Sequence, residues 1–215
     1  MSSSRTSQPA DSGESTTTYT SASTTGWTAY NGNGAASIDG GFKIALLAAQ
    51  SSSAAYPDTT SPKYYRNIAA DIAGSEDFTI WARIVSASMV SEQNIGIALG
   101  DSSDTTNVGI CAFTGSAGQL TCTPFASNGY IGAPSGVVAL DGTGWLGISR
   151  RGGLYSALGG TGTVKLPPTQ YASCMTATVS SNGYSIPTRF TIWAQKFGGT
   201  DMNGVFDDII IIKRG

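Results

Sequence analysis

Two tryptophans with polar neighbours are the side chains of this sequence whose type and spacing best suit ligand binding. Arg83 follows Trp81 by two positions, Gln195 follows Trp193 by two positions, and a threonine precedes each tryptophan by two positions. In a β-strand such residues share one face, where an indole can stack on an apolar surface while its neighbours form hydrogen bonds. The candidate ligand-binding residues are therefore Trp81, Arg83, Trp193 and Gln195. The alternative is that adjoining segments of the chain cover both indoles.

Residues suited to acid–base or nucleophilic catalysis are scarce. The chain contains no histidine and only three glutamates, Glu14, Glu76 and Glu92, none of which alternate along one strand. A retaining glycosidase needs two carboxyl groups about 5 Å apart, and histidine is the commonest general base. No Gly-x-Ser-x-Gly motif marks a serine nucleophile. We therefore assign no catalytic residue and predict that the chain is not an enzyme.

The oxygen-rich stretch Asp101-Ser102-Ser103-Asp104 is the candidate for a metal site. Calcium takes six to eight oxygen ligands, of which this stretch offers two carboxylates. A solvated turn is the favoured alternative. We therefore predict no cofactor, with Ca²⁺ at Asp101 and Asp104 left open.

Three cysteines, Cys111, Cys122 and Cys174, lack the spacing of a metal site. A two-residue turn at residues 116–117 would pair residues whose numbers add to 233, which sets Cys111 opposite Cys122. Buried thiols are the alternative to a disulfide between these two residues.

The charge of the chain argues against some partners. The net charge is -2 and only 12% of the residues are charged, without a cluster of Lys and Arg that could follow a phosphate backbone. Apolar runs such as residues 209–212 are far shorter than the roughly 20 residues that span a bilayer. The N-terminus also lacks the apolar run of a signal peptide. We expect neither nucleic acid nor membrane as a partner.

Turn signals and short apolar segments predict a chain of β-strands. Five Asn-Gly pairs and many further glycines separate segments in which apolar residues alternate with polar ones. Ten strands are predicted, at residues 42–48, 78–86, 95–99, 108–114, 119–123, 145–150, 154–158, 174–180, 190–196 and 205–213. So many strands imply two packed sheets. The last strand is apolar on both sides, as in a central covered strand, so Asp207 or Asp208 must be paired or capped within it.

The first residues of the chain differ sharply in composition from the rest. Fifteen of the first 25 residues are Ser or Thr, and almost none is apolar. Such a segment cannot bury enough surface to fold alone. We predict an N-terminal arm at residues 1–26 and a β-sandwich domain at residues 27–215.

Four stretches resemble the concanavalin A-like lectin/glucanase superfamily, in the laminin-G-like branch that includes phage virion proteins. They are YYRNI at 64–68 with GSEDFTI at 74–80, GIALGD at 96–101, GWLGISRRGGLYS at 144–156, and GVFDDII at 204–210. The resemblance covers residues 64–213 and consists of strands and turns rather than a catalytic signature. It implies an all-β fold, an antiparallel two-sheet jelly-roll sandwich, here with an extended N-terminal arm.

Two functions follow from this resemblance and from the composition. The first is a non-enzymatic bacteriophage virion structural protein, a capsid decoration protein or a head or tail fibre module, that docks through its N-terminal arm. It would be assembled in the host cytoplasm, lie on the virion surface and contact other virion proteins such as the major capsid protein or the fibre base, with homo-oligomers open. The alternative is a lectin-like adhesion module that binds host glycans through Trp81 and Trp193.

Overall fold

The computed structural model of the chain describes residues 13–19, 26–39, 43–48, 60–72, 76–88, 93–100, 108–115, 120–126, 143–162, 167, 172–178, 188–197 and 202–214. Every regular element in these ranges is a β-strand. No helix in them is long and apolar enough to cross a membrane. The predicted all-β fold is thus confirmed.

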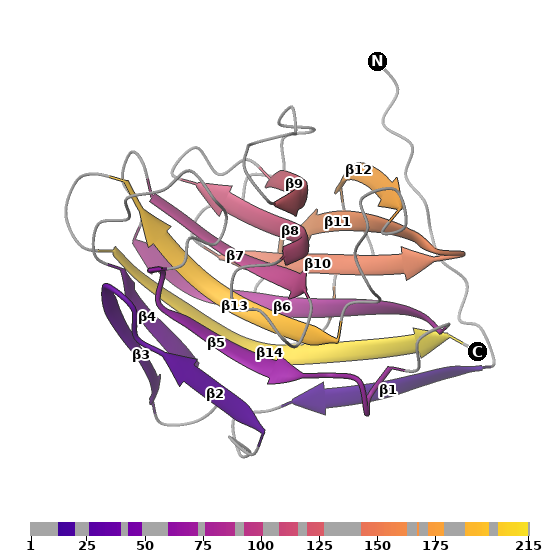
Figure 1. Cartoon of the computed structure of the whole chain (residues 1–215), viewed down its shortest axis with the longest axis horizontal. Helices are drawn as coiled ribbons and strands as arrows, with labels where there is room; N and C mark the ends of the chain where they lie inside the picture. Colours follow the sequence, from indigo (N-terminus) through magenta and orange to yellow (C-terminus); the bar gives the residue numbers. More distant parts are fainter. Residues whose placement is uncertain are drawn as a thin grey trace.

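Antiparallel pairing gathers the strands into two sheets, stacked as two layers (Figure 1). The eight-stranded sheet contains β1 (Glu14–Tyr19), β3 (Gly34–Asp39), β4 (Lys43–Ala48), β6 (Asp77–Ser88), β10 (Gly144–Arg151), β11 (Leu154–Gly160), β12 (Ala172–Thr178) and β14 (Met202–Arg214). Its order is β12-β11-β10-β6-β14-β4-β3, and β1 pairs with β14 beside β4. The six-stranded sheet contains β2 (Trp27–Tyr30), β5 (Lys63–Asn67), β7 (Gln93–Gly100), β8 (Val108–Gly115), β9 (Leu120–Ala126) and β13 (Arg189–Lys196), in the order β2-β5-β13-β7-β8-β9.

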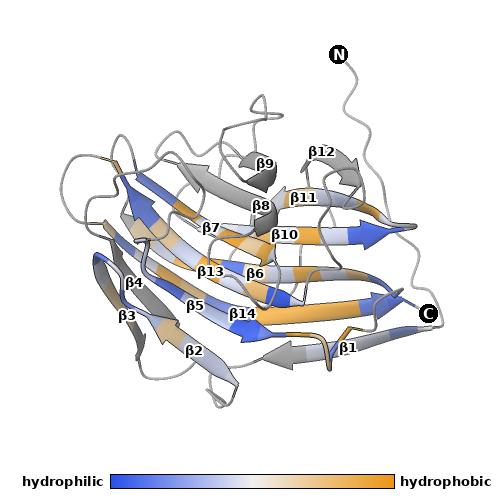
Figure 2. Cartoon of the chain, viewed as in Figure 1, coloured by the Kyte–Doolittle hydropathy of each residue, from blue (hydrophilic) through white to orange (hydrophobic). Residues whose placement is uncertain are grey.

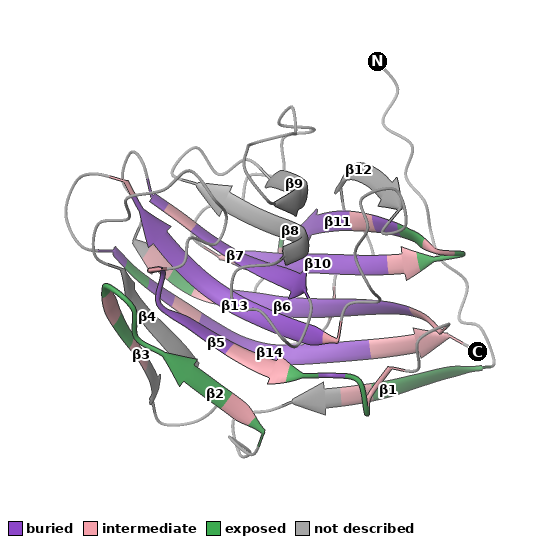
Figure 3. Ribbon diagram, in the orientation of Figure 1, coloured by how far each residue is buried: buried purple, intermediate pink, exposed green. Residues whose placement is uncertain are grey.

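Alternating residues of the central strands build the core between the sheets. Phe78, Ile80 and Ala82 of β6 belong to the same buried cluster as Phe190 and Ile192 of β13. Figure 3 shows that burial is greatest in the middle strands of both sheets, while β1 and β2 are exposed over much of their length. The period-two pattern therefore assigned the inner faces of these strands correctly.

Strand β14 is covered on both of its faces, as its sequence predicts. Ile209 and Ile211 lie in the core between the sheets, whereas Ile210 lies in a second cluster on the outer side of the eight-stranded sheet. Figure 2 shows this strand as a long apolar run. It pairs with β6 along one edge and with both β4 and β1 along the other.

The predicted N-terminal arm is not separate from the sandwich over residues 14–19. These residues form β1, which pairs antiparallel with β14 from Glu14 opposite Arg214 to Tyr19 opposite Ile209. Arg214 Nε donates to Glu14 Oε1 at 2.8 Å. A hydroxyl-rich strand needs no apolar face when backbone hydrogen bonds attach it to a sheet edge, and β-branched Thr favours that conformation. Residues 1–12 and 20–25 of the predicted arm lie outside the described residues.

All ten predicted strands are present, with ends within three residues of the predicted ones. Four further strands escaped prediction: β1, β2, β3 and β5. Between β2 and β3 the chain crosses from one sheet to the other at Asn31–Asn33, where Gly32 has a φ of +54° and the Asn33 N–H donates to the Thr60 carbonyl at 2.7 Å. The Asn-Gly turn was recognised, but the short flanking strands carry no period-two pattern.

The register of β8 and β9 corrects the predicted cysteine pairing. Cys111 lies opposite Thr123, and Cys122 lies opposite Ala112, so paired residue numbers add to 234 rather than 233. The residues between the two strands, 116–119, are four and not two. The longer connection shifts the register by one residue, and the two cysteines do not face each other across the hairpin.

Candidate functional site

The four predicted ligand-binding residues lie on two different sheets. Trp81 and Arg83 are on β6 of the eight-stranded sheet, and Trp193 and Gln195 are on β13 of the six-stranded sheet. Their neighbours along each strand fill the core, so the four side chains point away from it, on opposite outer faces of the sandwich. The two indoles therefore do not share a surface, because sequence periodicity fixes the face of a strand but not the sheet to which it belongs.

Both indoles are also buried. Trp81 is 3% exposed and Trp193 is fully buried, and Arg83 and Gln195 are buried beside them. This agrees with the alternative interpretation, in which other parts of the chain cover the two tryptophans. Neither indole offers a free face to a ligand.

On the outer side of the eight-stranded sheet, Trp81 belongs to a closed apolar cluster. A Cβ atom on Gly147 would lie 2.6 Å from Cε3 of Trp81, so the indole rests directly on the backbone of β10. Trp145, Leu158 and Ile210 complete the cluster. Close packing of this kind stabilises the sheet and leaves no surface on which a sugar ring could stack.

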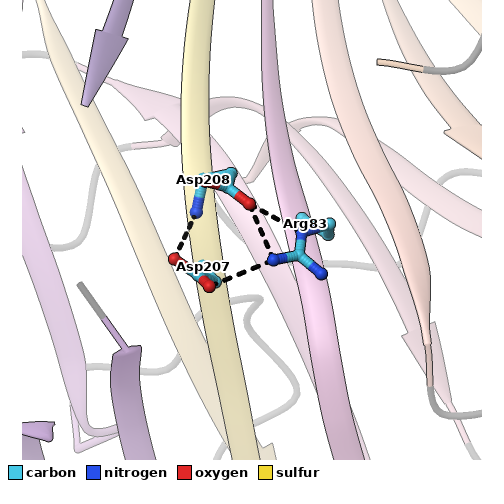
Figure 4. Close-up of polar contacts among 3 residues, drawn as sticks. All are labelled: Arg83, Asp207 and Asp208. Atoms are coloured by element: carbon cyan, nitrogen blue, oxygen red, sulfur yellow. Dashed lines mark hydrogen bonds and ion pairs between the residues drawn. The ribbon is translucent and has the colours of Figure 1, made fainter. Parts of the chain in front are cut away.

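Beside this cluster, Arg83 holds two aspartates of β14 (Figure 4). Its Nε donates to Asp208 Oδ2 at 2.8 Å, and its Nη2 lies 2.7 Å from Asp208 Oδ2 and 3.0 Å from Asp207 Oδ2. The Asp208 N–H donates to Asp207 Oδ1 at 2.9 Å. All three side chains are buried, so the expectation that these aspartates are paired is confirmed.

A bulge in β14 brings both aspartates to the same guanidinium. The pairing of β14 with β6 shifts register between Asp207 and Ile209, and Asp208 has a φ of +48°. Consecutive strand residues normally point to opposite faces, and a bulge changes that direction. Arg83 thus binds both carboxylates, and the backbone N–H of Asp208 binds that of Asp207 as well.

The outer side of the six-stranded sheet has a different chemistry. Lys63 lies opposite Tyr30 on β2 and opposite Trp193 on β13, and its Nζ is 5.1 Å from the centre of the Tyr30 ring. Tyr65 lies opposite Thr191, and the Arg189 guanidinium carbon is 5.4 Å from the centre of the Tyr65 ring. Two tyrosine rings on neighbouring strands thus each carry a cation over the ring, at cation–π distance.

These side chains form an edge that becomes more exposed from β13 to β2. Tyr30 is 39% exposed, Tyr65 is half-buried and Asn67 is exposed, whereas Lys63 and Arg189 are buried against the sheet. We call Tyr30, Lys63, Tyr65, Asn67 and Arg189 the tyrosine patch. What it presents at the surface is the Tyr30 ring, part of the Tyr65 ring and the Asn67 amide, whereas its two cations are covered.

The predicted residues of the six-stranded sheet lie next to this patch. Trp193 is the cross-strand neighbour of Lys63, and Gln195 Oε1 accepts a hydrogen bond from Ser61 Oγ at 3.3 Å. Sequence reasoning missed the two tyrosines. A spacing of two between Lys63 and Tyr65 was visible, but the partners of these residues come from β2 and β13, more than 30 and more than 120 positions away.

The other candidate site residues stand as follows. Asp101 and Asp104 lie outside the described residues, as does Glu92. Within the described part of the chain, no group of three or more His, Cys, Asp and Glu side chains could hold a metal ion. Glu14 binds Arg214, and Glu76 offers its carbonyl oxygen to Arg150 Nη1 at 2.7 Å.

Comparisons with known proteins show the fold. No family model and no curated protein matches the chain. Among solved structures, the CBM2 module of the evolved Dit of Lactobacillus casei BL23 phage J-1 has a TM-score of 0.57 and 14% identity, over 93% of this chain and 96% of that one. The Bacillus licheniformis β-glucanase has a TM-score of 0.52 and 11% identity, over 90% and 97%. The chain therefore has the jelly-roll sandwich fold, which a carbohydrate-binding module and a glucanase share.

Proposed function

We propose that the chain is a non-catalytic carbohydrate-binding module of the concanavalin A-like type, which holds a sugar chain over the tyrosine patch. The observation that carries this proposal is the pair of tyrosine rings, Tyr30 and Tyr65, at the exposed edge of the six-stranded sheet. Aromatic faces stack on the C–H faces of sugar rings, and a neighbouring exposed amide, here that of Asn67, binds the hydroxyls.

The carboxylates of the chain support a binding role without catalysis. The strands of the six-stranded sheet contain no Asp or Glu, so the strands under the proposed sugar supply neither an acid nor a nucleophile. On the other sheet, Asp207 and Asp208 are buried and bound to Arg83. A fold shared with a carbohydrate-binding module is compatible with this role.

The two exposed large apolar side chains of the described residues give a matched test. Tyr30, 39% exposed, belongs to the patch, and Leu154, 46% exposed, lies on β11 of the other sheet. A glycan array should identify a bound sugar, and Tyr30→Ala should weaken its binding about tenfold, equivalent to about 1.4 kcal/mol of lost stacking. Leu154→Ala should leave the affinity unchanged. An array without any bound glycan, or an unchanged affinity of Tyr30→Ala, overturns the proposal.

We also propose that the module acts on the surface of a bacteriophage virion, attached to a capsid or fibre-base protein through residues that precede β1. Two observations support this: the fold is that of a module of a phage Dit protein, and the Ser- and Thr-rich N-terminal residues are poor in apolar side chains. An extended segment of that composition gains affinity by covering a long stretch of its partner.

The position of β1 sets the design of the corresponding deletion. Removing residues 1–12 keeps β1 and its pairing with β14, whereas a deletion through residue 25 would also remove a strand of the sheet. The shorter deletion should abolish co-sedimentation with virions and leave the melting temperature unchanged. Retained co-sedimentation would show that docking uses another surface.

A further inference from the structure

The accessible part of the tyrosine patch follows β2 and β5, at the edge of the six-stranded sheet. Tyr64 and Trp27 pack on the core side of these strands, so their sequence neighbours Tyr65 and Thr28 lie on the outer side, as do Tyr30 and Asn67. Thr28, Tyr30 and Asn67 are exposed, and Tyr65 is half-buried. Because Thr28 lies opposite Tyr65, Tyr30 and Tyr65 are diagonal neighbours about 7 Å apart.

Each of the two tyrosine rings has one face against a buried cation. Lys63 Nζ lies 5.1 Å from the centre of the Tyr30 ring, and the Arg189 guanidinium carbon lies 5.4 Å from that of the Tyr65 ring. Ring and cation attract each other, so these contacts hold the rings in place. Lys63 is 1% exposed and Arg189 is 5% exposed. A ligand can therefore reach each ring only from the opposite face, and the cations support the rings without contacting the ligand.

The burial of the next strand gives such a ligand a direction. Thr191 and Trp193 on β13 are covered, so the accessible surface does not continue across the sheet. It continues along β2 and β5, from Tyr30 past Tyr65 to Asn67. Tyr30 lies opposite Lys63, four positions before Asn67, and a rise of about 3.4 Å per residue makes the row about 13 Å long. The row is longer than a single sugar ring.

Asn67 gives the far end of this row a hydrogen-bond donor of fixed orientation. Its Oδ1 accepts a hydrogen bond from the Ala69 N–H at 2.8 Å. The amide oxygen is thereby held at the backbone, and the Nδ2 group can donate to a hydroxyl of the ligand. Thr28 adds a hydroxyl beside Tyr65.

We propose that the ligand of the tyrosine patch is the interior of an extended, linear polysaccharide, which runs along β2 and β5 with one sugar unit on Tyr30, another on Tyr65 and a hydroxyl bound by Asn67. This inference rests on the proposed carbohydrate-binding function and specifies its ligand. Separate groups in a row contact successive units of a chain, whereas a single small ligand is held by polar groups that converge on a pocket.

The test measures affinity against the length of the sugar. Oligosaccharides of one to six units are taken from four linear series: β-1,4-linked glucose, β-1,4-linked xylose, β-1,4-linked N-acetylglucosamine and α-1,4-linked glucose. Calorimetry with the full chain should show, in at least one series, an affinity that rises at least about tenfold from one to three units and then levels off. A soluble polymer of that series should bind several protein molecules per chain, because an interior site recurs along it.

Substitutions in the row should act on the long ligand more than on the short one. Tyr30→Ala should reduce the gain in affinity between one and three units at least about threefold. Asn67→Ser keeps an oxygen that can accept from the Ala69 N–H and removes the amide donor, so it should also weaken binding of the three-unit sugar. Leu154→Ala, on β11 of the other sheet, should change the affinity at no length. If Asn67→Ser lowers the melting temperature, Tyr30→Ala decides the question.

Three results would overturn the linear ligand and leave the carbohydrate-binding function standing. The first is equal affinity for one and three units, and the second is an equal loss in Tyr30→Ala at every length, since the patch would then hold a single sugar unit. The third is one protein molecule per polymer chain, which would mean that only a chain end is bound.

The glycan array distinguishes a failure of this inference from a failure of the proposed function. If the array shows binding to terminal or branched sugars and none of the four series binds, the linear ligand is overturned and the function stands. If the array identifies another linear polysaccharide, its own series of one to six units takes the place of the four. No binding on the array or in any series would overturn both proposals.

Discussion

The same five residues, Phe-Thr-Ile-Trp-Ala, occur near the start of β6 at 78–82 and in β13 at 190–194, yet the two outer faces differ. The inner residues of both strands fill one core. On the outside, Trp81 packs on Gly147 and Ile210 in an apolar cluster, whereas Trp193 lies beside Lys63 and near two tyrosines. The strand's own sequence determines which side faces the core, and its cross-strand neighbours determine what the outer side can do.

The residue directly after each pentapeptide differs between the two strands, and so do its partners. Arg83 follows the first and binds Asp207 and Asp208, and Gln195 follows the second and accepts a bond from Ser61. On the outer side of the eight-stranded sheet, Arg83 forms ion pairs with two aspartates. On the outer side of the six-stranded sheet, cations lie over tyrosine rings. The comparison predicts that substitutions around Trp81 and Arg83 change the stability of the fold, whereas substitutions in the tyrosine patch change the affinity for the ligand.

The largest effect is expected when Arg83→Gln gives β6 the residue that β13 has. The substitution leaves two buried carboxylates without their guanidinium, which should lower the free energy of unfolding by about 3–5 kcal/mol. Urea denaturation measures it. Adding Asp207→Asn and Asp208→Asn should recover a large part of the loss, because the uncompensated charge is then removed. A loss below about 1 kcal/mol in Arg83→Gln would show that the cluster does not stabilise the sheet.

A smaller effect is expected at the glycine under Trp81. Gly147→Ala places a methyl group 2.6 Å from the indole, so β10 or Trp81 must shift. Overpacking of this kind costs about 1–3 kcal/mol. Gly13→Ala is the control, since a Cβ there would meet nothing within 4 Å. If both variants unfold at the same urea concentration as the wild type, Trp81 is free to move and the apolar cluster is not closed.

Strand β1 pairs with β14 in the eight-stranded sheet, and β2 pairs with β5 in the six-stranded sheet. A substitution in β1 is expected to change stability only slightly. β1 covers the edge of β14, and Glu14 fixes its first residue to Arg214 at 2.8 Å. Glu14→Gln should reduce stability by only about 0.2–1 kcal/mol, because the pair is partly exposed. Faster hydrogen exchange should be confined to the β1–β14 pairing and should spare β2 and β5. Uniformly faster exchange would mean that β1 unfolds only with the whole domain.

The sequence allowed most of the fold to be predicted, because ten strands have alternating or continuous apolar residues that a core requires. β2 and β5 escaped because they are four and five residues long, and β1 because its side chains are hydroxyls. The site was harder to predict for a physical reason. Trp81 and Trp193 look equivalent along the chain, and only long-range strand pairing places them on opposite faces. The same pairing brings Tyr30, Lys63 and Arg189 together.

The last comparison concerns one buried tyrosine on the core side of each sheet. Burial raises the pKa of Tyr64 on β5, and it raises the pKa of Tyr155 on β11, where Arg150 offsets part of the rise. The ordinary tyrosine pKa is about 10, so the unfolded chain loses these protons first as the pH increases. Stability should be complete below pH about 10 and should fall as the pH rises through the raised folded pKa values.

Phenylalanine in place of either tyrosine removes the group that ionises. Urea denaturation of the wild type, Tyr64→Phe and Tyr155→Phe from pH about 8 to about 11.5 should show a shallower loss of stability in each variant, with the offset at pH 8 as the baseline. The Arg150 guanidinium partly offsets the rise in the pKa of Tyr155, and burial is the cause given for Tyr64. The two variants should therefore differ in how much they flatten the pH dependence of stability. Parallel curves for all three proteins would mean that neither phenol keeps its proton more firmly in the folded chain than in the unfolded one.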